Sequence, residues 1–186
     1  MKLYGSYTSP FVRQCRIALA EENFDFEFVE TDQAGSAIQT PTQRVPFLED
    51  GEVFLTDSST ILKYIREKSG KTFLQNVKEW DEYCLINTLM DTTANLFFLE
   101  RDGVDLNAYA YTKRQSARIG SILEELNARP LPKLAPYSDA QLRLACYLDW
   151  ADIRKRIKLD LYPNLIEFLD GAKNYSHFKN TAIPKT

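Results

Sequence analysis

The chain has 186 residues, of which 44% are hydrophobic and 26% are charged, and its formal net charge is −3. This balance is typical of a folded globular protein, and the length suffices for one large domain or two small ones. Basic residues form no run, which argues against a nucleic-acid partner. The N-terminus lacks a signal-peptide pattern, and no apolar stretch approaches the roughly 20 residues that cross a membrane, so we expect no membrane partner.

The three cysteines, Cys15, Cys84 and Cys146, are odd in number and far apart, and the chain has a single histidine, His177. This composition argues against structural disulfides and allows no zinc-binding spacing. We therefore expect a cytoplasmic protein without a metal ion.

The chain begins with a strand, a helix and a second strand. Residues 2–7 predict a short strand, and residues 10–23 carry apolar side chains at helical spacing, with Pro10 in the first turn. Residues 24–30 place phenylalanine at every second position, which indicates a strand. Residues 36–44 show no regular period.

A hairpin and a helix complete the first third. Two apolar runs flank Asp50-Gly51, a pair typical of tight hairpin turns. Residues 58–70 predict a helix that ends at Gly70. The expected order is β-α-β, an irregular stretch, then β-β-α.

The remainder shows only helical periods. Ser138 and Gln141 have the spacing of a capping box, and the helix that follows them is apolar on almost every side. Such a helix belongs in the centre of a bundle. We expect a first domain over residues 1–73 and an all-helical second domain over residues 77–186.

Three segments of the first domain carry candidate chemistry. Ser9 stands at the start of a helix, where free N–H groups and the helix dipole favour an anion or a thiolate. Val45-Pro46 precedes a strand, and a cis bond there would leave the Val45 backbone free to pair with an extended peptide. Asp57-Ser58 opens another helix and can hold an ammonium together with a carboxylate. A thiol, a peptide backbone and an amino-acid end together describe glutathione.

These motifs, in the order "LYGSYTSPFVRQCRIALAEE", "TPTQRVPFLEDG" and "DSSTILKYI", resemble those of the soluble glutathione transferases. The resemblance covers nearly the whole chain. It implies a thioredoxin-like α/β domain of order β-α-β-α-β-β-α, packed on a C-terminal α-helical bundle domain. It also implies a homodimer and glutathione as co-substrate.

The resemblance assigns roles residue by residue. The reactive position that precedes Pro-Phe in related classes is Ser9 here, with Thr8 as competitor for the same sulfur and Phe11 beside the ligand. Val45, before the family's cis proline Pro46, pairs with the glutathione backbone, and Arg44 falls where related classes carry a lysine near the glycyl carboxylate. Asp57 and Ser58 take the γ-glutamyl end.

The implied activity is that of a transferase of alkyl or aryl groups, as in detoxification. Ser9 would stabilise the thiolate of glutathione for attack on a small apolar electrophile, with Phe97, Phe98, Tyr109 and Tyr111 as expected wall residues. Because cysteine is absent at positions 9 and 12, dithiol exchange is excluded at this site. The alternative is a non-catalytic binding or regulatory protein on the same fold. Ser9 and Asp57 also fit ordinary helix caps. Cys15, Trp80 and Trp150 fit packed interior positions.

Overall fold

The computed structural model describes residues 1–184, which divide into two compact units. The first comprises Met1–Gln75 together with the segment from Asn174 onward, and the second is Asn76–Lys173. The second domain was expected to run to residue 186, whereas the structure places the C-terminal segment with the first unit. Within residues 1–184, no helix combines the length and apolar character needed to cross a bilayer.

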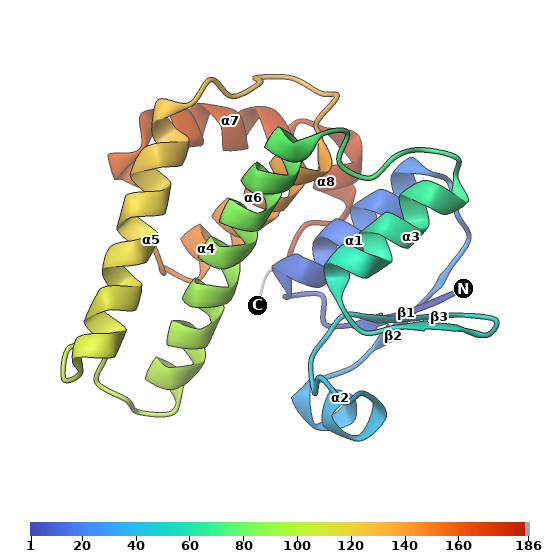
Figure 1. Cartoon of the computed structure of the whole chain (residues 1–186), viewed down its shortest axis with the longest axis horizontal. Helices are drawn as coiled ribbons and strands as arrows, with labels where there is room; N and C mark the ends of the chain where they lie inside the picture. The colour runs from blue at the N-terminus through green and yellow to red at the C-terminus, as the bar shows by residue number, and fades with distance from the viewer. Residues whose placement is uncertain (185–186) are drawn as a thin grey trace. The chain divides into compact units, whose positions relative to one another are not determined.

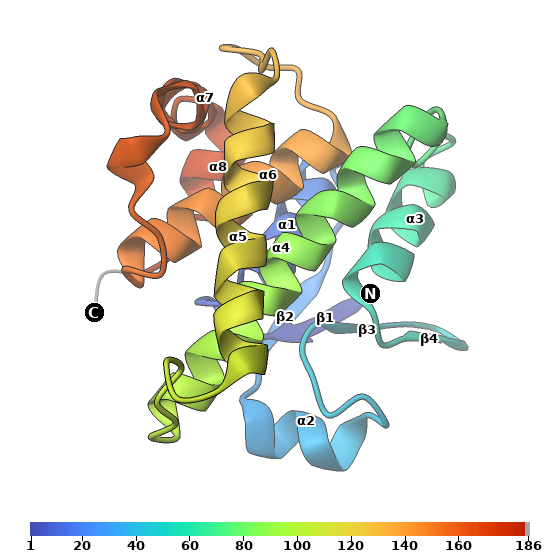
Figure 2. The same cartoon turned by 60° about the vertical axis from the view of Figure 1, so that its left-hand side comes forward.

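The first unit is built on a four-stranded mixed sheet of order β2-β1-β3-β4 (Figure 1). β1 (Lys2–Gly5) is parallel to β2 (Glu27–Glu30) and antiparallel to β3 (Phe47–Asp50), which pairs in turn with β4 (Val53–Leu55). α1 (Pro10–Glu21) and α3 (Ser58–Lys68) cover one face, and α2 (Gln33–Gln39) lies at the other (Figures 1 and 2). This is the expected thioredoxin-like arrangement.

Local sequence explains most of these elements. Apolar side chains of α1 and α3 pack with those of β1 and β3 into a fully buried core, formed by Leu3, Val12, Ile17, Phe47, Leu48, Ile61, Leu62 and Ile65. The hairpin turns at Gly51, whose φ of 62° lies in the left-handed region that glycine adopts easily. The expectation of an irregular stretch at 36–44 was partly wrong, because Asp32 caps α2 by accepting a hydrogen bond from the Gly35 amide at 2.8 Å.

The second unit is all-helical. It contains α4 (Val77–Arg101), α5 (Ala110–Ala128), α6 (Asp139–Ile153), the short η1 (Leu159–Leu161) and α7 (Pro163–Lys173). α6 is the buried central helix that the sequence predicts, and its capping box is present: the Gln141 amide donates to Ser138 Oγ at 3.2 Å, and the Ser138 amide donates to Gln141 Oε1 at 2.9 Å. Trp150 is buried, but Trp80 is 41% exposed, so its expected interior position was wrong.

The last helix, α8 (Ser176–Asn180), belongs to the first unit and packs on α1. Arg13 of α1 is only 1% exposed, and its Nη2 donates to the Phe178 carbonyl at 2.9 Å. The Tyr175 hydroxyl donates to Glu21 at 2.7 Å. Two charged residues of α1 therefore fasten the chain's C-terminal segment to the sheet domain.

Candidate functional site

The strand register brings the three predicted segments to one end of the sheet. In the antiparallel β1–β3 pair, Tyr4 lies opposite Phe47, so β1 ends where β3 begins. In the β3–β4 hairpin, Leu48 lies opposite Leu55, so β4 also ends there. The loop from β1 to Ser9, the Val45-Pro46 segment before β3 and the Asp57-Ser58 segment after β4 therefore all leave the sheet at this end.

Ser9 is the N-cap of α1. Its Oγ accepts a hydrogen bond from the Val12 amide at 3.4 Å, which is near the outer limit for such a bond. Ser9 is half-buried, and its backbone amide donates to the Ser6 carbonyl at 3.1 Å. The Ser9 hydroxyl acts only as an acceptor in this bond, so its own proton is left for a further acceptor at the positive end of the helix.

Thr8, the competing hydroxyl, already has a partner. Its Oγ1 lies 3.0 Å from Ser6 Oγ, and its amide donates to the same oxygen at 3.3 Å. The sequence reasoning did not single out Ser6. The available signal was the run of hydroxyl residues at positions 6, 8 and 9, which precedes the helix directly.

Val45 and Pro46 are joined by a cis peptide bond, as the sequence interpretation expected. Val45 is half-buried and lies outside the β1–β3 ladder, which begins at Phe47, whereas Pro46 is buried. Arg44 precedes them on an exposed turn, next to Gln43, which has a φ of 53°. The backbone of Val45 thus continues the line of β3 beyond its pairing with β1.

Asp57 caps α3 and remains exposed. One carboxylate oxygen, Oδ1, accepts a hydrogen bond from the Ser59 amide at 2.7 Å. Ser58 is 4% exposed, and its carbonyl lies 3.9 Å from the thiol sulfur of Cys15 on α1. Cys15 itself is fully buried, which fits its expected packing role. The contact ties the start of α3 to α1.

Aromatic stacking holds the strands together at this end. The rings of Tyr4 and Phe47 are stacked, with centroids 4.4 Å apart and an interplanar angle of 10°. The Tyr4 hydroxyl donates to Glu49 at 2.8 Å. This hydrogen bond, with some burial, raises the pKa of Tyr4 above its ordinary value. Phe11, in the first turn of α1, is half-buried.

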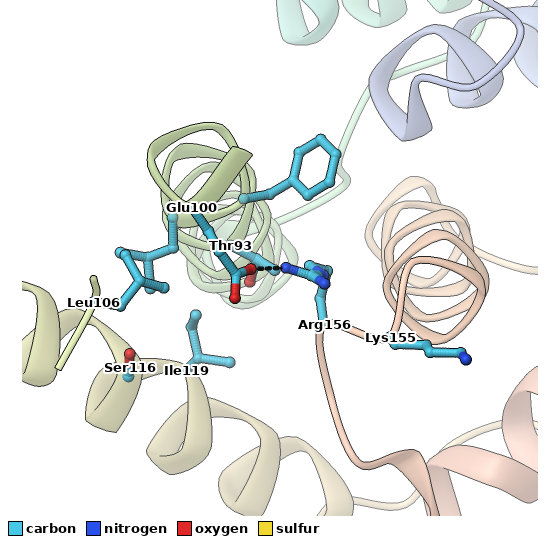
Figure 3. Close-up of a pocket in the computed structure, with 9 residues that line it drawn as sticks. Thr93, Glu100, Leu106, Ser116, Ile119, Lys155 and Arg156 are labelled. Atoms are coloured by element: carbon cyan, nitrogen blue, oxygen red, sulfur yellow. Dashed lines mark hydrogen bonds and ion pairs between the residues drawn. The ribbon is translucent and has the colours of Figure 1, made fainter. Parts of the chain in front are cut away.

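The expected wall residues of the second unit have different environments. Phe97 packs edge-to-face against Trp150, with ring centroids 5.9 Å apart, and lines a pocket within that unit. Tyr109 and Tyr111 are 60% and 69% exposed, and Phe98 is half-buried. Of these four side chains, only Phe97 lines this pocket, which is drawn in Figure 3. Among residues 1–184, no group of three or more His, Cys, Asp or Glu side chains is placed to hold a metal ion.

Comparisons with known proteins identify the family of this chain. Residues 3–73 match the family described as the N-terminal domain of glutathione S-transferase. Glutathione S-transferase Z1 of Arabidopsis thaliana is 36% identical over an alignment of 204 positions, which covers the whole chain and 92% of that protein.

Two solved structures share the fold. A glutathione S-transferase from Methylobacillus flagellatus, with glutathione bound, superposes with a TM-score of 0.80 at 23% identity, over 97% of this chain and 98% of the other. A maleylpyruvate isomerase, described as a bacterial glutathione S-transferase of the zeta class, gives a TM-score of 0.72 at 18% identity, over 98% and 96%.

Proposed function

Because this chain belongs to the glutathione S-transferase family, we propose that its first unit binds glutathione and that Ser9 stabilises the bound thiolate for attack on a small apolar electrophile. The observation that carries the proposal is the convergence of Ser9, Val45-Pro46 and Asp57-Ser58 at one end of the sheet. In this arrangement, the thiol, the peptide backbone and the γ-glutamyl end of glutathione each have one matching segment of the chain.

The tripeptide fits these segments in order. The sulfur receives the Ser9 hydroxyl proton as a hydrogen bond at the start of α1. The cysteinyl backbone pairs with Val45 ahead of β3, and Arg44 attracts the glycyl carboxylate. Asp57 uses its remaining carboxylate oxygen for the γ-glutamyl ammonium, while the first turn of α3 offers N–H groups to the carboxylate beside it.

Ser9 acts by shifting an equilibrium. A free thiol has a pKa of about 8.5, so only a few per cent is ionised at neutral pH. A hydrogen bond to the thiolate and the dipole of α1 both favour the ionised form, and one pKa unit corresponds to about 1.4 kcal/mol. A depression of about one to two units makes most of the bound thiol reactive near pH 7.

The test is the ultraviolet absorbance of the thiolate in the glutathione complex, measured against pH. The wild-type chain and Ser9→Thr, which keeps the hydroxyl, are expected to show a lowered thiol pKa. Ser9→Ala is expected to return it toward the free value, with a loss of about 1 kcal/mol of stability from the missing cap. Thr8→Val should leave the thiol pKa nearly unchanged. If Ser9→Ala keeps the lowered pKa, Ser9 does not have this role.

The γ-glutamyl assignment has its own test. Asp57→Asn keeps an N-cap residue but removes the negative charge, so helix stability should change little. Retention on immobilised glutathione should fall about tenfold or more, since the ammonium loses its charged partner. Unchanged retention would remove Asp57 from the binding site. Asp105→Asn is the control, because Asp105 is exposed in the loop between α4 and α5 and its carboxylate also accepts a hydrogen bond from a backbone amide two residues further along.

A second candidate reaction, cis–trans isomerisation, is favoured by the match to the zeta-named relative over the whole chain. The same thiolate would add to the double bond of a conjugated acid, the resulting single bond would rotate, and elimination would return glutathione unchanged. Assays with an aryl halide and with a maleyl compound distinguish the two reactions. Retention on glutathione without either reaction would support the non-catalytic alternative.

We further propose that the chain acts as a cytoplasmic homodimer. A measurement of its size in solution tests the dimer.

A further inference from the structure

The loop that carries Ser9 is a tight turn. The Ser9 amide donates to the Ser6 carbonyl at 3.1 Å, so residues 6–9 form a β-turn with Tyr7 and Thr8 at its corner. Ser6 Oγ also accepts a hydrogen bond from the Thr8 amide at 3.3 Å. The backbone and the side chain of Ser6 therefore both hold the turn from within.

The end of β1 packs closely against α1. A Cβ atom added to Gly5, the last residue of β1, would lie 2.5 Å from Cγ2 and 2.7 Å from Cγ1 of Val12. The amide of the same Val12 donates to Ser9 Oγ. The turn therefore begins and ends against the first turn of α1, and its corner is the part that these contacts leave to be fixed.

The corner residue Tyr7 is held between side chains of α1 and β2. Its ring centroid lies 4.5 Å from that of Phe28, with an interplanar angle of 47°. The guanidinium carbon of Arg16 lies 4.7 Å from the centroid of the Tyr7 ring and 5.3 Å from that of Phe28. All three side chains are half-buried. A guanidinium over two aromatic rings attracts both of them, and its planar shape packs well on them.

The sequence positions of these residues explain why they meet. Arg16 follows Ser9 by seven positions, or about two helical turns, and helical side chains point back toward the N-terminus. Arg16 therefore reaches the turn that precedes its own helix. Phe28 of the edge strand β2 lies beside Leu3 of β1, and paired residues share one face of a sheet, here the face that α1 covers.

We propose that Arg16 is a positioning residue for the reaction of the first unit, which holds the Tyr7 ring in place and thereby fixes the turn that directs the Ser9 hydroxyl. This inference rests on the thiolate role proposed for Ser9. A hydrogen bond weakens steeply as its geometry departs from the preferred angle. A looser turn should therefore lose part of the thiolate stabilisation although the Ser9 hydroxyl is still present.

The test is the thiol pKa of bound glutathione, read from the thiolate absorbance against pH. Arg16→Met keeps the apolar stem without the guanidinium, and Tyr7→Leu removes the ring. Each should raise the thiol pKa by about half a unit to one unit above that of the wild-type complex. The double variant should raise it no further than the larger single change, because both break the same contact. Tyr7→Phe keeps the ring and should match the wild type.

Binding separates positioning from a general loss of structure. At about pH 5.5 the thiol is mostly protonated in every complex, so retention of these variants on immobilised glutathione should stay within about twofold of wild type. If Tyr7→Leu does not fold, Phe28→Leu replaces it, because it removes the other ring that the guanidinium contacts. Lys68→Gln is the matched control. Lys68 lies 5.3 Å from the centroid of the Tyr64 ring and pairs with Asp50, at the far end of β3 from the site, so its loss should leave the thiol pKa unchanged.

Three results would overturn the proposal. A raised pKa in Arg16→Met but not in Tyr7→Leu would mean that Arg16 acts by its charge alone. Additive shifts in the double variant would mean that the two residues act by separate routes. Equal shifts in Tyr7→Phe and Tyr7→Leu would assign the effect to the Tyr7 hydroxyl. Ser9→Ala distinguishes this inference from the proposed function: if Ser9→Ala alone raises the pKa, the role of Arg16 falls and that of Ser9 stands.

Discussion

The two units secure their central helices with different chemistry. In the first unit, the guanidinium of the buried Arg13 lies 3.7 Å from the centroid of the Phe178 ring, and Arg66 of α3 pairs with Glu21 at 2.6 Å and Glu22 at 2.5 Å at the end of α1. In the second unit, twelve of the 15 residues of α6 are buried, and most of them are apolar. Ion pairs thus add to the apolar packing of α1, whereas α6 is held mainly by close packing, together with the buried Arg143, whose guanidinium carbon lies 4.3 Å from the centroid of the Tyr83 ring.

This difference determines which substitutions should destabilise each unit most. A buried ion pair is most sensitive to the loss of one partner, because the other charge is left without compensation. A close-packed helix interface is most sensitive to added atoms, because its neighbours have little room to move. The two units should therefore respond to different substitutions and to different solution conditions.

The largest effect is expected from Arg66→Ala. This change leaves Glu21 and Glu22 with a missing partner, and their side chains are only 13% and 4% exposed. Because Glu22 keeps Lys71 and Glu21 keeps the Tyr175 hydroxyl, a loss of about 3 kcal/mol in the free energy of unfolding is expected, at the lower end of the range for a broken buried ion pair. Urea unfolding measures it, with Lys63→Ala as control, since the Lys63–Glu67 pair on the same helix is exposed and contributes about 0.5 kcal/mol or less. Equal losses in the two variants would contradict the role given to buried charge.

Gly171→Ala tests close packing in the second unit. A Cβ atom at this position of α7 would lie 2.1 Å from the Lys133 carbonyl oxygen, so the backbone must shift. We expect a destabilisation of about 1–3 kcal/mol, although alanine favours a helix more than glycine does. Gly120→Ala on α5 is the matched control, because no atom lies within 4 Å of its added Cβ, and it should stabilise the helix by about 1 kcal/mol. Thermal unfolding distinguishes them, and a stabilised Gly171→Ala would refute the contact.

Local patterns predicted the features whose causes lie close together in the sequence. The hairpin at Gly51, the capping box at Ser138 and the helix after Ser9 each depend on residues within a few positions of one another. The cis Val45-Pro46 bond was expected from its place ahead of a strand in a family pattern. The three site segments were found in this way, because each sits at the end of a regular element.

Contacts between residues far apart in the sequence could not be predicted from such local patterns. Arg13 lies on a helix with no local sign that it is buried, and its partner Phe178 is 165 positions away. The pocket beside Arg156 joins residues of three separate segments, so no spacing marks it. Trp80 looked like an interior residue from its type alone, yet it lies on the exposed side of α4. Sequence reasoning predicted the candidate glutathione site of the first unit, and it did not predict the pocket of the second.

A smaller effect is expected in acid, where the first unit should begin to lose stability at a higher pH than the second. Burial tends to raise the pKa of Glu22, but hydrogen bonds from Lys71, Arg66 and Ser69 outweigh it and lower the pKa below the ordinary value of 4.5. A carboxyl with a depressed folded-state pKa stabilises the fold above the unfolded value, and this contribution is lost as the pH falls below about 4.5 toward the folded value. Hydrogen exchange should therefore accelerate in α1 and α3 before α6 as the solution is acidified. Glu22→Gln should flatten this dependence, and an unaltered acid profile would exclude Glu22 as its source.

The smallest effect is expected from Lys155→Gly. Glycine adopts the left-handed conformation of this residue without the cost of a Cβ, and it also raises the entropy of the unfolded chain, so the net stabilisation should be at most about 1 kcal/mol. The hydrogen bonds at this end of α6 are made by backbone groups, so they should survive the change. Thermal unfolding measures the difference. A loss of stability would mean that the side chain of Lys155, and not its backbone conformation, decides the stability of this helix end.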